Sequence, residues 1–136
     1  MSVFRIGQGF DIHPFSQDPE RPLVIGGEIL PGPGLDGHSD ADLLAHAIAD
    51  ALLGAAGLED IGHYFPDTEP STLNANSLEI LEKPKLQPYK KGIQERMSNI
   101  LNAPVTVKGR RAEGLGFVGK GEGAACLVVA LISKYE

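Results

Sequence analysis

Residues 43–56 read Leu-Leu-Ala-His-Ala-Ile-Ala-Asp-Ala-Leu-Leu-Gly-Ala-Ala, and this stretch decides the fold class. It is rich in alanine and leucine, which are strong helix formers, and Gly57 follows as a typical C-terminal stop. Upstream, Ser39 and Asp42 have the spacing of a capping box, with aspartate in place of the usual glutamate or glutamine. We therefore predict one long helix over residues 43–56.

Two strand patterns precede this helix. Residues 4–12 alternate loosely between apolar and other side chains, which predicts a first strand. Residues 23–25 and 28–30 flank Gly26-Gly27, a pair suited to the positive φ angles of a tight turn. We therefore predict a short β-hairpin at this point of the chain.

The second half of the chain predicts a further helix and two strands. Residues 89–101 have a helical pattern, and residues 105–107 and 124–133 have strand patterns, the last apolar enough for burial on both faces. The order of elements predicts a single α+β domain over residues 1–136, with helices packed on one face of a mixed sheet. The core face of the later helix is predicted to consist of Ile93, Met97, Ile100 and Leu101.

Composition and charge limit the function. A chain of 136 residues suits one domain, and its net charge of -6 argues against a nucleic-acid partner. The single cysteine, Cys126, lies in an apolar run, so we expect a buried thiol and no internal disulfide. The sequence has no stretch of about twenty apolar residues and no charged-then-apolar leader, so we expect neither a membrane span nor a signal peptide. We therefore expect a location in the cytoplasm or in the stroma of an organelle.

Three residues suggest a metal site. Asp11 and His13 stand two residues apart on the predicted first strand, so their side chains leave the same face. His46 lies on the predicted helix, one turn after Asp42, which could hold its imidazole in one tautomer. Two imidazole nitrogens and one carboxylate oxygen form a familiar zinc ligand set with an open position for substrate. Taken alone, each of these residues can also be explained as an ordinary surface, capping or helix residue. Taken together, they predict a catalytic divalent-metal site.

A phosphate site is predicted beside the metal. His38 and Ser39 lie where the predicted helix begins, and free backbone amides and the helix dipole favour an anion there. A simple capping role for Ser39 is the plainer alternative. The sequence therefore favours, without requiring, a phosphorylated ligand.

Residues 108–120 predict a glycine-rich loop that carries cations and a carboxylate. Glycines let the backbone approach a ligand closely, and Arg110, Arg111 and Lys120 could neutralise a diphosphate. Glu113 offers a carboxylate for a second, oxygen-preferring cation such as Mg²⁺. Beside the predicted metal site, this loop indicates an enzyme that acts on a phosphorylated small molecule.

Several motifs follow one another along almost the whole chain. These motifs are Ile6–His13, Gly37–Asp42, His46, Asp60–Gly62, Phe65–Thr68, Pro84–Lys85 and Glu113–Gly123. Together they resemble those of the 2-C-methyl-D-erythritol 2,4-cyclodiphosphate synthases, which belong to the non-mevalonate pathway of isoprenoid (terpenoid) biosynthesis.

The resemblance implies a metal-dependent phosphorus-oxygen lyase. It implies a homotrimer with active sites between subunits, zinc on Asp11, His13 and His46, and a second divalent cation, Mg²⁺ or Mn²⁺, on Glu113. The implied substrate is 4-diphosphocytidyl-2-C-methyl-D-erythritol 2-phosphate. Its 2-phosphate attacks the β-phosphorus, which closes a cyclic diphosphate and expels CMP. Such a reaction needs positioning and charge neutralisation more than a protein nucleophile.

The resemblance also implies which residues contact the substrate. His38 and Ser39 match phosphate-binding positions, and Lys120 and Glu122 match a charged pair near the trimer axis, beside a cavity for isoprenoid diphosphates. The implied catalytic residues are Asp11, His13, His38, Ser39, Asp42, Arg111 and Glu113. The implied substrate-binding residues, besides His38 and Ser39, are Asp60 and Gly62 for the hydroxyls, Phe65, Pro66 and Asp67 for the wall of that pocket, Pro84, Lys85, Leu86 and Gln87 for the cytidine, and Arg110, Arg111, Ala112, Glu113, Phe117 and Lys120.

The chain departs from the family pattern in two places. Family members carry threonines where Arg110, Arg111 and Ala112 precede Glu113, so an arginine would replace a hydroxyl contact to phosphate. Residues 77–81 begin a helix, but Pro84 follows almost at once, where family members continue the helix and add a strand. Two explanations remain open: residues are missing from the sequence near 81–84, which the intact flanking motifs favour, or the chain carries a real deletion.

Two other functions fit the same residues. A zinc phosphohydrolase would use the metal to activate water, and it would release inorganic phosphate instead of CMP and a cyclic product. A non-catalytic trimeric module would bind isoprenoid diphosphates along its axis, and a real deletion would favour it.

Overall fold

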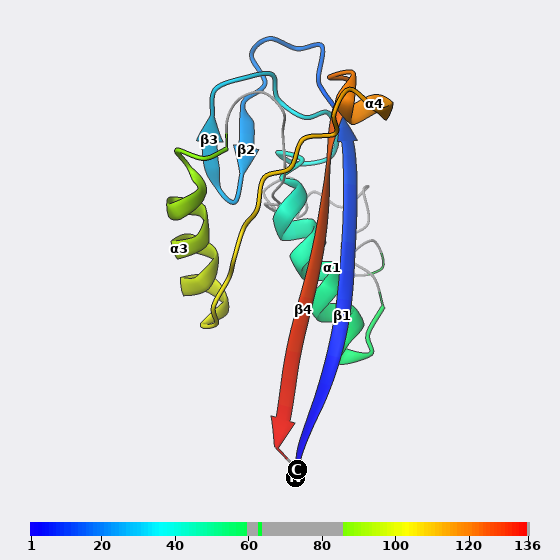
Figure 1. Cartoon of the computed structure of the whole chain (residues 1–136), viewed down its shortest axis with the longest axis vertical. Helices are drawn as coiled ribbons and strands as arrows, with labels where there is room; N and C mark the ends of the chain where they lie inside the picture. The colour runs from blue at the N-terminus through cyan, green and yellow to red at the C-terminus, as the bar shows by residue number, and fades with distance from the viewer. Residues whose placement is uncertain (60–62, 64–85, 136) are drawn as a thin grey trace.

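The computed structural model describes residues 1–59, 63 and 86–135, and it shows an elongated α+β molecule (Figure 1). Two long antiparallel strands, β1 (Ser2–Pro14) and β4 (Gly123–Tyr135), form a ribbon against which α1 (Leu43–Ala56) packs. The hairpin of β2 (Leu23–Ile25) and β3 (Glu28–Leu30) and the helix α3 (Lys90–Leu101) lie on the same side of the ribbon as α1.

The β1–β4 ribbon has two different faces. Side chains alternate along each strand, and the register pairs Ile6 with Leu131 and Phe10 with Leu127. These four side chains are exposed on the face away from α1, whereas Gly7 and Gly9 are buried against it. The strand predicted over residues 124–133 is therefore buried on one face only, and the described residues leave an apolar face uncovered.

The predicted helix over residues 43–56 is confirmed at both ends. Gly57 adopts φ 76° and its amide donates to the carbonyl of Gly54, which ends the helix in a left-handed cap. The predicted capping box is wrong, because the N-cap residue is Asp42 and its side chain makes no capping bond. Instead the Asp40 carboxylate accepts the Asp42 amide at 3.2 Å.

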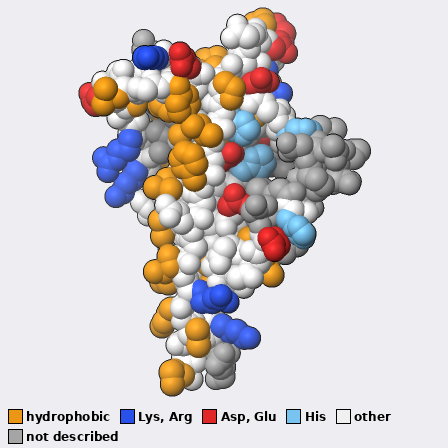
Figure 2. Space-filling view, turned by 90° about the vertical axis from the view of Figure 1, so that its right-hand side faces the viewer, with side chains coloured by type: hydrophobic (Ala, Val, Ile, Leu, Met, Phe, Trp, Pro, Cys, Tyr) orange, Lys and Arg blue, Asp and Glu red, His pale blue; other side chains and the backbone are white. Residues whose placement is uncertain are grey.

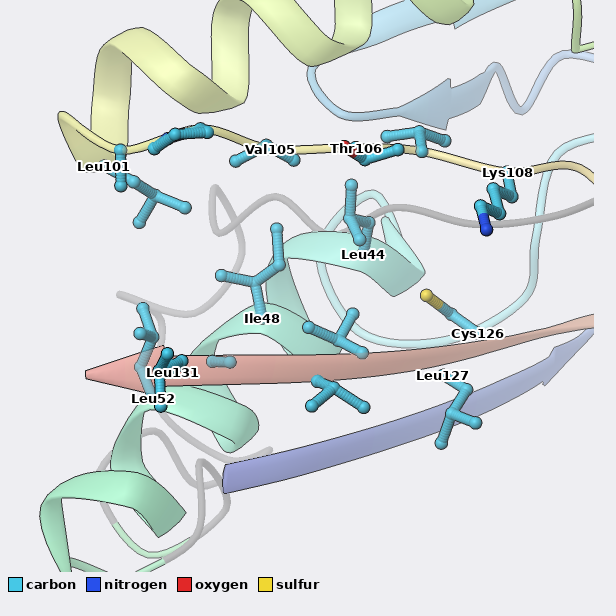
Figure 3. Close-up of a pocket in the computed structure, with 16 residues that line it drawn as sticks. Leu44, Ile48, Leu52, Leu101, Val105, Thr106, Lys108, Cys126, Leu127 and Leu131 are labelled. Carbon is cyan, nitrogen blue, oxygen red and sulfur yellow. The ribbon is translucent and has the colours of Figure 1, made fainter. Parts of the chain in front are cut away.

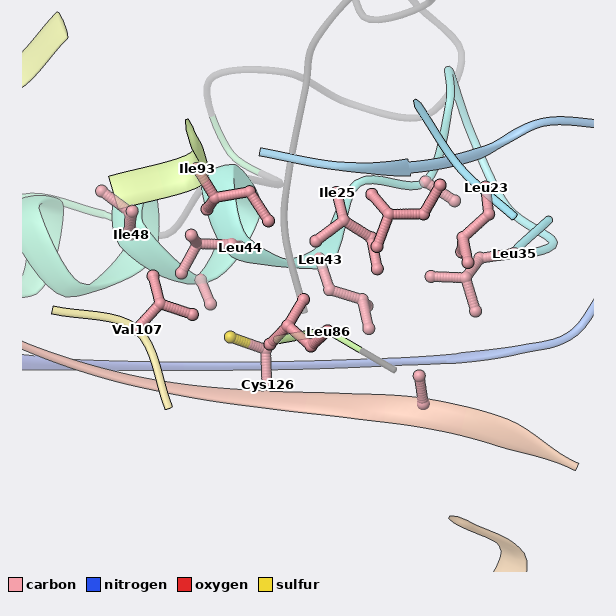
Figure 4. Close-up of a cluster of buried hydrophobic side chains, with 14 of the residues drawn as sticks. Leu23, Ile25, Leu35, Leu43, Leu44, Ile48, Leu86, Ile93, Val107 and Cys126 are labelled. Carbon is pink, nitrogen blue, oxygen red and sulfur yellow. The ribbon is translucent and has the colours of Figure 1, made fainter. Parts of the chain in front are cut away.

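The predicted hairpin is also confirmed, and its turn explains the glycine pair. Gly26 and Gly27 have φ of 60° and 71°, which a two-residue hairpin turn of this type requires. Apolar side chains from the hairpin, from α1 and from α3 meet in one core (Figure 4). The core includes Leu23, Ile25, Leu30, Leu35, Leu43, Leu44, Ile48, Leu86, Ile93, Met97, Val107, Ala124 and Cys126.

Helix α3 confirms the helix predicted over residues 89–101, but only part of its apolar side is core. Ile93 and Met97 are buried and Leu101 packs against the core, whereas Ile100 is 69% exposed. The prediction for Ile100 is therefore wrong in this chain, because no described element covers that end of the helix. Cys126 is buried, as predicted.

The predicted strand over residues 105–107 does not form. Its Val-Thr-Val pattern suits a strand, but the amides of Val105 and Val107 donate to the side chains of Ser98 and Gln94 on α3. No described strand pairs with this segment (Figure 3). A strand pattern cannot become a strand without a partner, and this is the physical reason for the difference.

The predicted mixed sheet is likewise not found in the described part of the chain. Its strands form two separate antiparallel pairs, β1 with β4 and β2 with β3. The short α4 (Gly116–Gly119) precedes β4.

The helix start predicted at residues 77–81 lies outside the described residues. No helix among those described is long and apolar enough to cross a membrane.

Candidate metal centre

Glycines bring the two halves of the site together. On β1, Gly7, Gly9, Asp11 and His13 all face α1, because side chains two residues apart share a face. A Cβ atom built on Gly9 would lie 1.8 Å from the carbonyl oxygen of Ala47 on α1, a distance that no real side chain allows. The strand therefore contacts the helix backbone directly, and Asp11 comes within reach of the helix side chain next to Ala47, which is His46.

The three predicted metal ligands converge. Nε2 of His13 lies 3.2 Å from Oδ2 of Asp11, and Nδ1 of His46 lies 3.4 Å from the same oxygen. One ligand atom from each residue lies within 4.8 Å of the others, and all three side chains are partly buried. The convergence predicted from a strand pair and a helix histidine is therefore found in the structure.

Asp11 shows why this group fits a cation. Its Oδ2 is buried and makes no well-formed hydrogen bond among the described atoms, although two ring nitrogens face it. A buried, unsatisfied carboxylate oxygen is costly unless a positive charge neutralises it. Burial alone would raise the pKa of Asp11, but the rings of His13 and His46 outweigh this effect and lower the pKa to about 2. The carboxylate is thus ionised at neutral pH and available as a ligand.

The backbone of residues 36–37 orients His13. Nδ1 of the ring lies 2.8 Å from the carbonyl oxygen of Asp36, which can only accept, so Nδ1 donates and the neutral ring presents a free lone pair at Nε2. A Cβ atom on Gly37 would lie 2.6 Å from this ring, so only glycine leaves room for it. The Asp11 carboxylate is the main influence on the pKa of His13, and it raises that pKa above 6.5.

Arg21 holds the loop of residues 35–39, which contacts the His13 ring. Its guanidinium donates to the backbone carbonyls of Leu35, Gly37 and Ser39, with the last two at 2.9 and 2.7 Å. Ser39 and Ala41 have φ of 50° and 51°, which is uncommon for residues other than glycine. Such strained backbone persists where surrounding contacts determine it and is frequent at functional sites.

Asp42 does not have the position that the sequence predicted. Its carboxylate accepts the amides of Gly26 and Gly27 at 3.1 and 2.9 Å, so it anchors the β2–β3 turn to the start of α1. The orienting role toward His46 is therefore wrong, because both oxygens point to the hairpin. Asp42 is fully buried, and this burial raises its pKa well above the usual value.

The candidate phosphate residues lie at two places. His38 and the half-buried Ser39 lie just before α1, beside Asp40, whose pKa is raised by burial. Glu113, with φ 54°, lies in an exposed loop before α4 and is not part of the metal cluster. The loop is nevertheless at the metal end of the ribbon, since the amide of Phe15 donates to the carbonyl of Glu122 at 2.9 Å. Arg110, Arg111 and Lys120 are also exposed, and Ala112 and Phe117 are half-buried.

Figure 2 shows histidine and acidic side chains gathered on one face of the molecule, next to atoms that are not described.

Of the predicted cytidine-binding turn, Leu86 and Gln87 are described. The Leu86 side chain is buried in the core, and its carbonyl accepts the amides of Tyr89 and Lys90. Gln87 is exposed. The predicted residues Asp60, Gly62, Phe65, Pro66, Asp67, Pro84 and Lys85 lie outside the described residues.

Sequence reasoning missed Arg21, the Asp36 carbonyl and the packing role of Gly37. No local pattern marks Arg21, because the carbonyls that it bonds are defined only by the folded loop. The approach of β1 to α1 had a detectable signal. Gly7 and Gly9 continue the two-residue spacing of Asp11 and His13, which indicates one strand face that closely contacts another backbone.

Comparisons with known proteins agree with this geometry. The model of the YgbB family matches residues 4–83 and 80–133. The 2-C-methyl-D-erythritol 2,4-cyclodiphosphate synthase of Enterococcus faecalis is 43% identical over 159 aligned positions, which cover 97% of this chain and all of the relative. The enzyme of the same name from Geobacillus thermodenitrificans is 44% identical over 161 positions, with 98% and 99% covered.

Solved structures show the same fold. The bifunctional IspDF of Campylobacter jejuni has a TM-score of 0.87 and 34% identity, and the match covers all of this chain and 43% of that one. IspF of Plasmodium falciparum, solved as a CDP complex, has a TM-score of 0.78 and 32% identity, with 94% of each chain covered. This chain therefore belongs to the YgbB family, whose curated relatives are 2-C-methyl-D-erythritol 2,4-cyclodiphosphate synthases.

Proposed function

We propose that this chain is a 2-C-methyl-D-erythritol 2,4-cyclodiphosphate synthase, a phosphorus-oxygen lyase. An oxygen of the substrate's 2-phosphate forms a bond to the β-phosphorus of the diphosphate, and the bond from that phosphorus to the bridging oxygen breaks. CMP leaves with the bridging oxygen, and the cyclic diphosphate remains. The observation that carries the proposal is the buried Asp11 oxygen that two imidazoles face, in a chain matched over nearly its whole length by such synthases.

Asp11, His13 and His46 would hold a zinc ion. When bound, the ion would neutralise and orient a phosphate oxygen at its open fourth position. The chain's own contribution is rigidity: the Asp36 carbonyl fixes the His13 tautomer, and the contact of Gly9 with α1 fixes the distance from strand to helix. Positioning of this kind suits a reaction in which both reacting phosphates belong to one substrate.

Charged groups around the metal would hold the rest of the substrate. His38 and Ser39 precede α1, where backbone amides favour a phosphate. Arg110 and Arg111 would neutralise the diphosphate, and Glu113 would bind the second divalent cation, Mg²⁺ or Mn²⁺. The residues proposed for the methylerythritol pocket, Asp60, Gly62 and Phe65–Asp67, and those proposed for the cytidine, Pro84–Gln87, complete the site.

We further propose that the active protein is a homotrimer with its sites between subunits. Phe4, Ile6, Phe10, Leu127, Val129 and Leu131 are all at least half exposed on one face of the ribbon. A continuous apolar face of this kind marks an interaction surface. Glu113 lies outside the cluster of Asp11, His13 and His46, in agreement with its proposed role as the ligand of a second cation. The bacterial relatives support a cytoplasmic location.

The proposal is tested by product analysis. Zinc-loaded protein with Mg²⁺ should convert the substrate to CMP and the cyclic diphosphate in equal amounts. Asp11→Ala and His46→Ala should each lower turnover by at least about a hundredfold, because an incomplete ligand set binds zinc weakly. Glu20→Ala, on the exposed loop before β2, should leave turnover unchanged and serves as the control.

The alternatives give different results. Inorganic phosphate as the product would indicate the phosphohydrolase. A zinc-binding protein without turnover, whose ligand binding is indifferent to Asp11→Ala, would indicate the non-catalytic isoprenoid-diphosphate module. The identity of the relatives favours the synthase over both.

A further inference from the structure

Arg21 comes between β1 and β2 in the chain, and it contacts the loop before α1. Its guanidinium donates to the carbonyls of Leu35, Gly37 and Ser39, the last two at 2.9 and 2.7 Å. These three residues alternate along the loop, and the arginine itself is half-buried. A planar guanidinium carries a rigid fork of donors, so it can hold several acceptors in one arrangement. Arg21 therefore fixes one side of the segment 35–39.

The other side of this segment faces a metal ligand. The carbonyl of Asp36 accepts a hydrogen bond from Nδ1 of His13 at 2.8 Å. Successive carbonyls of extended backbone point to opposite sides, so bonds from Arg21 to the carbonyls before and after Asp36 direct the one between them toward the ring. The amide of Asp36 also donates to the carbonyl of Pro14, at 2.8 Å. The direction of the Asp36 carbonyl thus depends on a bond to β1 and on Arg21.

Two glycines bring the loop into direct contact with both side chains. A Cβ atom on Gly34 would lie 2.5 Å from the backbone oxygen of Arg21 and 2.8 Å from its Cγ. A Cβ atom on Gly37 would lie 2.6 Å from the ring of His13. The loop therefore fills the space between the arginine and the imidazole, and a shift of the loop at Arg21 would change its contact with His13.

The Asp36 carbonyl determines which nitrogen of His13 can bind a metal. A neutral ring carries one proton, and two acceptors compete for it: the Asp36 carbonyl beside Nδ1 and Oδ2 of Asp11, 3.2 Å from Nε2. With the proton on Nδ1, the lone pair of Nε2 is free for a cation. With the proton on Nε2, that lone pair is lost. A weaker contact with Asp36 would therefore favour the tautomer that cannot bind a cation at Nε2.

The charge of Arg21 acts in the opposite direction from its hydrogen bonds. The pKa of His13 is raised chiefly by Asp11, and the positive charge of Arg21 opposes this rise. The same charge would repel a divalent cation bound beside His13. If Arg21 acted through its charge alone, its removal would strengthen zinc binding. The sign of the change in zinc affinity therefore separates the two roles.

We propose that Arg21 is a positioning residue of the metal centre. Its bonds to the loop aim the Asp36 carbonyl at Nδ1 of His13 and so keep Nε2 open for the divalent cation. This inference rests on the metal-binding part of the proposed function and is independent of the substrate. It assigns part of the zinc affinity to a side chain outside the set of ligands.

Zinc titrations of the whole chain against a competing chelator test this role. We expect Arg21→Ala to bind zinc about tenfold more weakly than the wild type, as is typical for groups that orient a metal ligand. Arg21→Lys keeps the charge but lacks the planar fork, so it should bind zinc almost as weakly. Arg5→Ala is the matched control, because Arg5 donates to the Ala56 carbonyl at the far end of α1. This control should keep the wild-type zinc affinity.

The tautomer of His13 gives a second measurement, which a general loss of stability would not change. Ring-nitrogen NMR shifts are recorded on the folded, metal-free protein at a pH that keeps the ring neutral. We expect the proton on Nδ1 in the wild type and in Arg5→Ala, and a shift toward Nε2 in Arg21→Ala. Guanidinium ions, added far below the concentration that unfolds the protein, should restore part of the zinc affinity of Arg21→Ala and leave that of Arg5→Ala unchanged.

Two results would overturn the proposal. The first is zinc binding by folded Arg21→Ala that is as tight as that of the wild type, or tighter. The second, which decides the matter if Arg21→Ala does not fold, is wild-type zinc affinity in Arg21→Lys with the His13 tautomer unchanged. All these measurements omit the substrate. A wild type that binds zinc but forms no cyclic diphosphate would therefore contradict the proposed function and leave the role of Arg21 supported by the titrations.

Discussion

At the residue scale, the site depends on one carboxylate whose ionisation is coupled to two imidazoles. Oδ2 of Asp11 faces both rings, which lowers the pKa of Asp11 to about 2 and raises the pKa of His13 above 6.5. Without metal, the contact of Asp11 with His46 joins β1 to α1 and its contact with His13 lies within β1, and both contacts weaken when Asp11 loses its charge. The stability of the metal-free protein should therefore have a pH dependence that originates at this site.

We predict two pH ranges in which this contribution disappears. The pKa of Asp11 is lower in the folded state, so its contribution is present above 3.8 and is lost as pH falls toward 2. The pKa of His13 is higher in the folded state, so its contribution is complete below 6.5 and is lost as pH rises through the folded value. Urea unfolding of metal-free wild type and Asp11→Asn should therefore differ most at about pH 4–6. A difference that stays constant from about pH 2 to 9 would contradict this coupling.

At the element scale, backbone contact between β1 and α1 determines the geometry of the site. Gly7 and Gly9 have no Cβ atom, and a Cβ on either would lie 1.8 Å from a carbonyl oxygen of α1. The helix that carries His46 is thus packed against the strand that carries Asp11 without any side chain between them. A small increase in this spacing would separate the ligands.

We predict opposite effects for two glycine-to-alanine changes. Gly9→Ala should destabilise the fold by about 3 kcal/mol and weaken zinc binding, because the new methyl group forces α1 away from β1. Gly54→Ala should stabilise it by about 0.5 kcal/mol with zinc binding unchanged, since this exposed helical position has nothing within 4 Å of the new Cβ. Thermal unfolding and zinc titration measure both effects. Normal zinc affinity in a folded Gly9→Ala protein would contradict the role of the contact.

Local elements of the fold could be predicted from the sequence, and elements that depend on distant partners could not. The helix over residues 43–56 was predicted to the residue because its alanine content and Gly57 act locally. The convergence of Asp11 and His13 was predictable because strand spacing puts them on one face, and the contact with His46 depends on how α1 packs on β1. The strand at 105–107 failed because strands need a neighbour that no local pattern supplies. Asp42 was misplaced because the hairpin that engages it is distant in sequence.

At the scale of the whole molecule, the ribbon presents an apolar face that one copy of the described chain leaves open to water. Ile6 is 72% exposed in the middle of this face and pairs in register with exposed Leu131. Burial of such a face against other copies would stabilise the assembly through the hydrophobic effect. A substitution that disrupts this face should therefore abolish both assembly and catalysis.

We predict that a charge in this face dissociates the proposed trimer. Ile6→Lys should give monomers and at least about a hundredfold lower turnover, because each copy would lose the neighbour that is proposed to complete its site. Ile29→Lys is the control, since Ile29 is 70% exposed on β3, away from the ribbon face. Light scattering coupled to gel filtration measures the mass of each. A trimeric Ile6→Lys protein, or a monomeric wild type with full turnover, would contradict the proposed assembly.

The register of the ribbon has a practical consequence for engineering. Ser2 pairs with Tyr135, while the other end of the same ribbon pairs Pro14 with Gly123 beside His13. Ser2 and Tyr135 therefore lie at the end of the ribbon opposite Asp11 and His13 (Figure 1). Tags, fused domains or a short linker joining the two ends can be attached there at a distance from the chemistry, and a circularly permuted chain becomes a realistic design.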